Sequence, residues 1–246
     1  MQLSSERKKQ TGAFYTPHYW ASLAVDYMQK QISDFDEYLF YDPAAGEGAL
    51  LEALPKRARK IATTLEGQDV EILRQKGIEA YQYDFLKQEV DDLLFWLRWN
   101  ASEHKGLVVF TNPPYLKLGK DDYCEMKHKY KTNDATLLFI YRILKEIKPA
   151  KLAIFSKADI YSSPQSKKHS LRLGLSTRAI FHKGFVCPSF TWSGLKGNFP
   201  IVFNIFNGTE NDYYDDCGAC VIGSPFDIQL LKDGKPYKDG EKIFTY

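Results

Sequence analysis

Cysteine is scarce in this 246-residue sequence, which contains only Cys124, Cys187, Cys217 and Cys220. So few cysteines cannot build the disulfide framework that holds many small secreted domains together. Cys217 and Cys220 form a single CxxC, but a structural zinc site needs four ligands, and no second CxxC or histidine pair follows. We therefore expect free thiols and no bound metal.

Long apolar runs are also missing. Stretches such as residues 107–110 are only a few residues long, whereas a membrane-spanning helix needs roughly 20. The first ten residues are polar and basic with no apolar segment behind them, which is unlike a secretory signal. With 44% hydrophobic and 26% charged residues, the composition is that of a globular chain. We expect a folded cytoplasmic protein with no membrane partner.

The net charge of +2 is small, but its distribution along the chain is uneven. Residues 145–183 contain nine Lys or Arg and two acidic residues, whereas residues 210–216 carry four acidic residues and no basic one. The basic segment is a candidate surface for a polyanion. A solvated face of no special function is the alternative interpretation.

Short apolar runs alternate with helical patterns, which predicts an α/β fold with a mainly parallel sheet. Thr16 and Pro17 resemble an N-cap and a first helical residue, so a helix is expected over residues 17–31. Further along the chain we expect strands that end at Asp42 and cover 62–65, 80–83, 107–111 and 152–156, and helices over 70–75, 90–99 and 135–147. Residues 178–185 and 200–206 predict a terminal antiparallel pair of strands.

A glycine-containing turn, Asp42-Pro-Ala-Ala-Gly-Glu-Gly48, connects the first expected strand to the next helix. Ligands of open α/β sheets bind beyond the carboxyl ends of the strands, where glycines let a ligand approach the backbone. A carboxylate at this point disfavours a pyrophosphate but suits an ammonium group and ribose hydroxyls. The turn thus favours S-adenosylmethionine over a dinucleotide, although a purely structural tight turn would read the same way.

Two further acidic residues fall near the expected ends of the next strands. Asp69, 27 residues after Asp42, is expected at the end of the second strand, where a carboxylate can hold ribose hydroxyls. Asp84 and Phe85 follow the third strand and would offer a carboxylate to an adenine amino group and an apolar ring to the base. The informative pattern is that three successive expected strands each end in an acidic residue.

The most specific pattern is Asn112-Pro113-Pro114-Tyr115, directly after the expected strand 107–111. Together with Gly-Ala-Phe-Tyr-Thr-Pro at 12–17, the loop at 42–48 and the apolar segment 137–140, it resembles the N6-adenine DNA methyltransferases of restriction-modification systems. The order of these motifs is that of the gamma class, and the resemblance covers roughly residues 7 to 206. It implies a Rossmann-like, class I S-adenosylmethionine-dependent methyltransferase fold with a seven-stranded sheet.

Residue by residue, the resemblance implies a cofactor site and a catalytic motif. The cofactor contacts would be Tyr15, Thr16, Asp42, Ala44, Gly46, Gly48, Asp69, Asp84, Phe85, Asn112 and Phe139. The catalytic groups would be Asn112, Pro113, Pro114 and Tyr115. An exocyclic adenine amine is a poor nucleophile because its lone pair is delocalised, and acceptors placed at both of its protons would turn that lone pair toward the methyl group. Cytosine-N4 enzymes more often carry Ser in place of Asn, so Asn112 favours adenine.

The resemblance also implies a pocket for a base extruded from the duplex. Tyr115 would stack on one side of this base, and Phe190, or failing that Trp192, on the other, although the sequence around 185–192 departs from the family pattern and these rings also suit a core. The basic segment would then face DNA phosphates through Lys167, Lys168 and Arg172.

The chain is short for a gamma-class enzyme that acts alone. We expect a catalytic domain over residues 1–206 and a short tail over 207–246 without a complete target recognition domain. Double-stranded DNA is the expected partner, with specificity from a missing C-terminal domain or a separate subunit. The alternatives are a protein glutamine methyltransferase, which uses the same tetrapeptide motif, and a non-catalytic cofactor-binding subunit.

Overall fold

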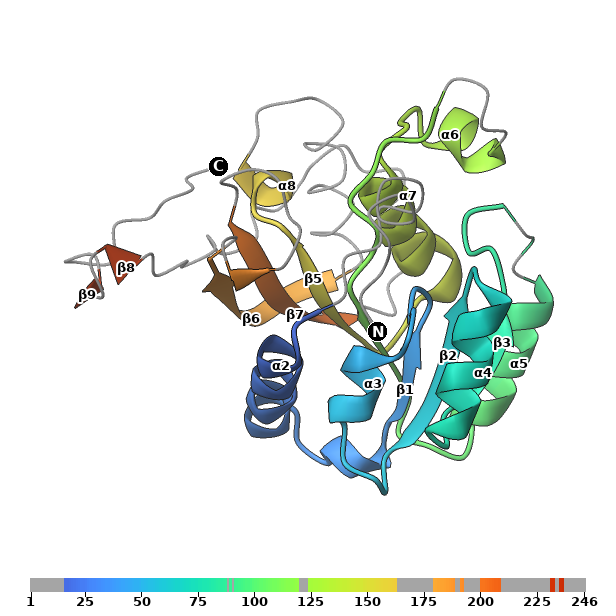
Figure 1. The fold of residues 1–246 in the computed structure, drawn as a ribbon, viewed down its shortest axis with the longest axis horizontal. Coiled ribbons are helices and arrows are strands. Elements are labelled where there is room, and N and C mark those ends of the chain that lie inside the picture. The colour runs from blue at the N-terminus through green and yellow to red at the C-terminus, as the bar shows by residue number, and fades with distance from the viewer. Residues whose placement is uncertain are drawn as a thin grey trace.

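The computed structural model describes residues 16–87, 89, 91–119, 124–162, 179–188, 191–192, 200–208, 231–232 and 235–236. Their main feature is a seven-stranded sheet flanked by helices (Figure 1). The helical elements are α2 (His18–Gln31), η1 (Phe35–Glu37), α3 (Ala49–Ala53), α4 (Gly67–Gln75), α5 (Asp91–Ala101), α6 (Glu125–Lys129), α7 (Ala135–Arg142), η2 (Ile143–Ile147) and α8 (Asp159–Ser162). The strands are β1 (Leu39–Asp42), β2 (Arg59–Thr64), β3 (Glu79–Gln82), β4 (Leu107–Thr111), β5 (Lys151–Lys157), β6 (Ala179–Cys187) and β7 (Ile201–Gly208), with a separate pair, β8 (Leu231–Lys232) and β9 (Lys235–Pro236).

The strand order is β3-β2-β1-β4-β5-β7-β6. The first five strands in this order run parallel to their neighbours, whereas β7 runs antiparallel to both β5 and β6. This arrangement confirms the expected α/β class, the seven-stranded sheet and the terminal antiparallel pair. Because β1 and β4 are adjacent but separated in sequence, the sheet has a topological switch point between them. Ligands of such sheets bind in the crevice beyond the strand ends at this point.

Apolar residues from alternating positions bury both faces of the sheet. Leu39 and Tyr41 of β1 belong to one hydrophobic cluster and Phe40 to the other, as the two-residue period of a strand requires. Helices α5 and α7 pack in the first cluster, and α2, α3 and α4 pack in the second. All five residues of the central strand β4 are buried, which explains its almost uninterrupted apolar sequence.

Helix α2 matches the expected helix but begins one residue later. Pro17 occupies the N-cap with extended backbone, so Thr16 is not the capping residue. The hydroxyl of Thr16 instead accepts a hydrogen bond from Asn112, 96 positions away. Within the described ranges, no helix combines the length and the apolar character of a membrane-spanning segment.

Candidate active site

Asp42 ends β1 and is the most buried carboxylate of the candidate site, with 2% of its surface exposed. Its Oδ1 accepts hydrogen bonds from the Ala44 backbone N–H at 3.0 Å and from the Thr111 hydroxyl at 2.7 Å. Burial raises the pKa of Asp42 to about 7, although both hydrogen bonds act in the opposite direction. A cationic ligand beside this carboxyl group would therefore stabilise its ionised form.

The glycine turn after β1 contains two residues with left-handed backbone. Gly46 has φ 52° and Gly48 has φ 88°, conformations that other residues rarely adopt. A Cβ atom at Gly48 would also lie 2.4 Å from Cδ2 of Leu73 in α4. Glycine at position 48 therefore suits the left-handed turn, and a larger residue there would also have to displace the end of the Leu73 side chain.

The structure corrects the expected position of Asp69. Strand β2 ends at Thr64, and Asp69 lies in the first turn of α4 with 4% of its surface exposed. The acidic residue that follows β2 is Glu66, at the N-cap of α4. Glu66 is half-buried and makes no side-chain hydrogen bond to its own helix. In the sequence, Leu65 continues the apolar pattern, which predicts a strand that reaches residue 65. In the structure Leu65 lies beyond the end of β2 and is 50% exposed.

Asp84 and Phe85 follow β3 as expected and begin a tight turn. Oδ1 of Asp84 accepts from the backbone N–H groups of Leu86 at 3.0 Å and Lys87 at 3.2 Å. The ring of Phe85 is 2% exposed and packs on Phe139 of α7, with ring centroids 4.8 Å apart. Two predicted cofactor residues that are far apart in sequence are thereby brought together.

Asn112 leaves the end of β4 with both ends of its amide group in hydrogen bonds. Its Nδ2 donates to the Thr16 hydroxyl at 3.1 Å, and its Oδ1 accepts from the Tyr115 hydroxyl at 2.6 Å. The hydroxyl of Thr136 in α7 donates to the Pro114 carbonyl oxygen at 2.9 Å. The catalytic motif expected from the sequence is therefore held from α7 and from the segment before α2, and its amide oxygen is oriented as an acceptor.

The ring of Tyr115 is enclosed in this structure, with 9% of the residue exposed. Burial, with smaller contributions from Cys187 and Tyr161, raises the pKa of its hydroxyl well above the usual range. The ammonium group of Lys157, on β5, lies 5.5 Å from the centroid of the Tyr115 ring. Tyr115 is thus a neutral hydrogen-bond donor throughout the ordinary pH range.

Trp192 is also buried, with 2% of its surface exposed, and packs edge-to-face on Phe155 with ring centroids 5.4 Å apart. Among the described residues, its indole N–H has no hydrogen-bond partner. In this structure Trp192 is a core side chain, and its stacking on a target base stays a prediction. Further predicted site residues lie outside the described part of the chain, namely Tyr15, Phe190, Lys167, Lys168 and Arg172.

The described cysteines, Cys124 and Cys187, are buried free thiols. Cys217 and Cys220 lie outside the described residues. In the part of the chain that the structure covers, no group of three or more His, Cys, Asp or Glu side chains has an arrangement suited to a metal ion.

Comparison with known proteins finds methyltransferases among the proteins similar to this chain. The chain is 27% identical over 190 residues to the type II methyltransferase M.VspI of Vibrio sp. (strain 343), an alignment that covers 72% of this chain and 44% of that protein. No family model matches the chain. The EcoKI M protein, from a type I restriction enzyme, superposes with a TM-score of 0.57 at 16% identity over 84% of this chain and 46% of that one. A Listeria monocytogenes protein described as a class I S-adenosylmethionine-dependent methyltransferase superposes with a TM-score of 0.56 at 12% identity, over 86% and 64% of the two chains.

These comparisons confirm two predictions from the sequence. The fold is that of class I S-adenosylmethionine-dependent methyltransferases, and the chain resembles the methyltransferases of restriction-modification systems. The chain spans less than half the length of the curated relative that it matches.

Proposed function

We propose that this chain is the catalytic part of a restriction-modification DNA methyltransferase, which transfers a methyl group from S-adenosylmethionine to the N6 amine of an extruded adenine. The observation that carries the proposal is the motif Asn112-Pro113-Pro114-Tyr115 at the end of β4, next to the buried Asp42 on β1. The two strands are adjacent at the switch point of the sheet. A methyl acceptor and a cofactor that bind beyond these two strand ends would be neighbours.

The residues around the crevice fit S-adenosylmethionine in chemical terms. A buried carboxyl group with a raised pKa, such as Asp42, is stabilised in its ionised form by a cation, and this cofactor carries an ammonium and a sulfonium group. The glycine turn presents backbone without side chains at Gly46 and Gly48. When bound, the cofactor supplies the methyl group on its sulfonium.

Glu66 is our candidate for the ribose hydroxyls in place of Asp69. It lies two residues beyond the end of β2, next to β1 in the sheet, and its carboxylate does not cap its own helix. Asp69 lies in the first turn of α4, where a negative charge stabilises the helix through its dipole. A carboxylate oxygen that accepts from both ribose hydroxyls explains an acidic residue at the strand end.

Asn112 and Pro113 act on the adenine amine. The Asn112 Oδ1 and the Pro113 backbone carbonyl would each accept a hydrogen bond from one amine N–H, so the nitrogen moves toward tetrahedral geometry and its lone pair becomes available; transfer would break the bond between the methyl group and sulfur, leave the thioether and release one amine proton to solvent. The prolines make the backbone that carries this carbonyl rigid. Catalysis rests on placed acceptors and on orientation, and no metal enters the reaction.

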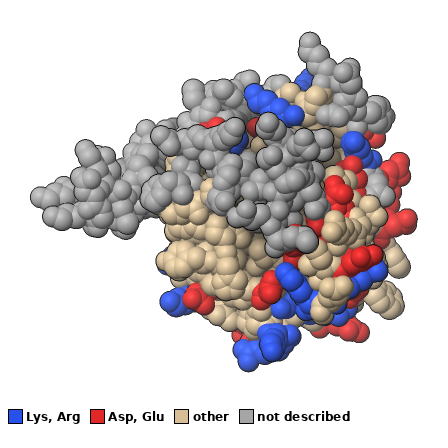
Figure 2. Space-filling view, viewed as in Figure 1, with Lys and Arg blue, Asp and Glu red and all other residues tan. Residues whose placement is uncertain are grey.

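DNA is the proposed partner, with sequence recognition from a further domain or a specificity subunit. We retain residues 1–206 as the catalytic domain and 207–246 as a tail. On the face shown in Figure 2, the described acidic and basic side chains are interspersed rather than gathered into a patch of one sign. The basic segment 145–183, with Lys167, Lys168 and Arg172, is our candidate for phosphate contacts because of its composition.

The test is methyl transfer from labelled S-adenosylmethionine to unmethylated DNA, with and without the proteins encoded beside this chain. Nucleoside analysis by mass spectrometry should show N6-methyladenine, and DNA already methylated at N6 should accept no label at those sites. N4-methylcytosine as the product would overturn the choice of base. Label incorporated only into the glutamine residue of a protein substrate would favour the glutamine methyltransferase alternative.

A further inference from the structure

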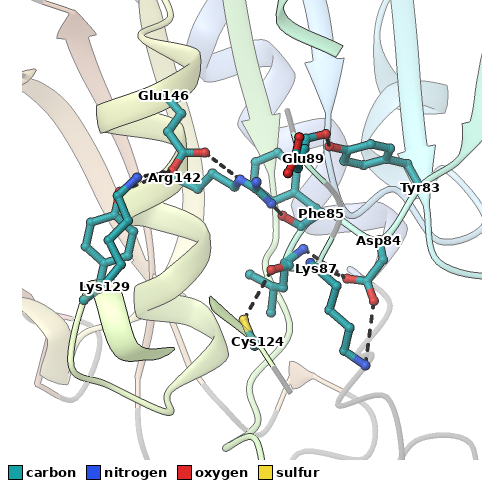
Figure 3. A network of polar contacts seen from close by, with 11 residues as sticks. Tyr83, Asp84, Phe85, Lys87, Glu89, Cys124, Lys129, Arg142 and Glu146 are labelled. Carbon is teal, nitrogen blue, oxygen red and sulfur yellow. Dashed lines mark hydrogen bonds and ion pairs between the residues drawn. The ribbon is translucent and has the colours of Figure 1, made fainter. Parts of the chain in front are cut away.

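The turn at residues 84–87 contains two of the proposed adenine contacts but sits at the edge of the sheet. It follows β3, which among the described strands lies at the edge of the sheet and pairs only with β2. An edge strand has one hydrogen-bonded neighbour, so the turn needs other support if its backbone is to be fixed. Figure 3 shows that this support comes from helix α7 on the other side of the turn.

Arg142, in the last turn of α7, provides the central contact. Its Nη1 donates to the carbonyl oxygen of Phe85, and its guanidinium carbon lies 5.5 Å from the centroid of the Phe85 ring. Its Nε donates to Oε2 of Glu146 at 2.7 Å, and the other oxygen of Glu146 accepts from Lys129 at 3.0 Å. Only 6% of Arg142 is exposed. This buried cation therefore connects the turn at 84–87 to helix α7 and at the same time forms an ion pair with Glu146.

The burial of the Arg142 guanidinium indicates a role beyond filling space. Burying a charged group is unfavourable unless the group is paired, and an apolar side chain of similar volume often stabilises a core at least as well. The network satisfies the charge: burial by itself raises the pKa of Glu146, but the hydrogen bonds from Arg142 and Lys129 bring it below the ordinary value. The specific effect of the guanidinium is to hold the backbone at Phe85.

The turn is fixed from two sides as a result. Asp84 Oδ1 accepts from the N–H groups of Leu86 and Lys87, and the Cys124 thiol donates to the Leu86 carbonyl oxygen at 3.2 Å. Arg142 donates to the carbonyl oxygen of Phe85, the residue between Asp84 and Leu86. Backbone donors and acceptors of three successive residues are thereby satisfied by side chains, which sets the direction of the Asp84 carboxylate.

We propose that Arg142 is a positioning residue for cofactor recognition: it holds the Phe85 carbonyl and so fixes the turn from which Asp84 and Phe85 read the adenine of S-adenosylmethionine. This inference rests on the proposed cofactor and extends it to a residue outside the motifs. Asp84 accepts from the 6-amino group of adenine, so a displaced turn loses selectivity for that group as well as affinity.

The experiment measures dissociation constants by calorimetry for S-adenosylhomocysteine and for S-inosylhomocysteine, in which a keto oxygen replaces the 6-amino group. Arg142→Met keeps the aliphatic stem but removes both hydrogen bonds. We expect it to weaken S-adenosylhomocysteine binding about tenfold or more, as for a lost charge-assisted hydrogen bond, and to reduce the preference over the inosyl analogue. Combined with Asp84→Asn, it should lower this preference no further.

Arg74→Met is the matched control. Arg74 also donates to a backbone carbonyl, that of Ala80 at 2.9 Å, and lies 5.9 Å from the Tyr81 ring centroid, but it acts on β3 itself rather than on the turn. It should leave both dissociation constants unchanged. Lost affinity with intact preference in Arg142→Met would mean general loosening and would overturn the proposal.

The outcomes separate this inference from the proposed cofactor. If the unmodified chain binds neither analogue, the cofactor proposal falls and Arg142 with it. If the unmodified chain binds and Arg142→Met retains both affinity and preference, only the role of Arg142 is overturned. Should Arg142→Met not fold, Glu146→Gln decides, because it retains an acceptor for Nε but removes the charge. It should reduce the preference in the same direction by a smaller factor, and an unchanged preference overturns the role.

Discussion

The two halves of the candidate site differ in how ready they are for a ligand. Asp42 ends β1, and Glu66 and Asp84 lie two residues beyond the ends of the neighbouring strands β2 and β3; the carboxylates of Asp42 and Asp84 accept hydrogen bonds from the backbone of the turns that follow them. Beyond β4, the rings of Tyr115 and Trp192 are enclosed by the protein's own side chains. In the proposed cofactor half, Asp42 and Asp84 hold backbone groups of their own turns, whereas in the proposed base half the Asn112 Oδ1 that the amine needs already accepts from the Tyr115 hydroxyl.

The strongest way to separate the halves is to remove the acceptor of the base half. Asn112→Ala deletes the Oδ1 proposed to accept a hydrogen bond from the adenine amine, and losing such a placed group typically lowers the rate by roughly 10²–10³-fold. We expect this loss in methyl transfer by an active assembly, with affinity for S-adenosylhomocysteine largely retained. Asn133→Ala, at an exposed position, is the control. Near-normal turnover in Asn112→Ala would exclude the proposed mechanism.

Within the cofactor half, the two candidate ribose residues can be tested against each other. Glu66→Gln should weaken S-adenosylhomocysteine binding about tenfold, because a charge-assisted hydrogen bond becomes a neutral one. Asp69→Asn should change it less than about threefold, since that residue lies inside α4. Calorimetric titration of both variants decides, and the reverse order would return the role to Asp69.

The sequence predicted most of the fold because the periodic patterns are strong. Strand β4 lies at the expected residues, and the buried positions of α2 have the spacing of a helix face. The error at Asp69 arose where an exposed apolar residue, Leu65, follows a strand, since local pattern does not reveal which side chains the fold covers. The bond from Arg142 to Phe85 joins residues 57 positions apart and depends on tertiary packing, so no local signal indicated it.

A pH titration tests whether Asp42 is poised for a cation. Its pKa of about 7 is above the value of about 3.9 in an unfolded chain, so its contribution to the free energy of unfolding is largest below pH 4 and falls as pH rises toward 7. A cationic ligand favours the ionised form of the Asp42 carboxyl group. The affinity of the chain for such a ligand should therefore rise about five- to tenfold between pH 6 and pH 8. Calorimetry at several pH values measures this rise.

Asp42→Asn is the matched variant for that titration. The amide retains an acceptor for the Ala44 N–H and the Thr111 hydroxyl but does not titrate. Its affinity should be weaker and independent of pH over the same interval. A variant with the same pH dependence as the unmodified chain would assign the titration to another group.

The smallest expected effect comes from removing the Tyr115 hydroxyl. It tests whether the hydrogen bond from this hydroxyl hinders the binding of a base. This hydroxyl donates to the same Asn112 Oδ1 that the adenine amine needs, so the hydroxyl and the amine compete for that oxygen. A neutral hydrogen bond has a net value of roughly 0.5–1.5 kcal/mol. Tyr115→Phe removes the competing donor and keeps the ring, so kcat/KM for DNA should rise about threefold while affinity for S-adenosylhomocysteine stays the same.

Tyr27→Phe supplies the comparison, because the Tyr27 hydroxyl also donates to an acceptor, the Gly184 carbonyl oxygen at 3.3 Å, but takes no part in the site. It should leave kcat/KM for DNA unchanged. A fall in kcat/KM for Tyr115→Phe would show the opposite arrangement: the hydroxyl would then orient the Asn112 amide in the reactive state rather than occupy it. In that case Tyr115, Asn112 and Thr16 form a preorganised set, and the base half is as ready for its ligand as the cofactor half.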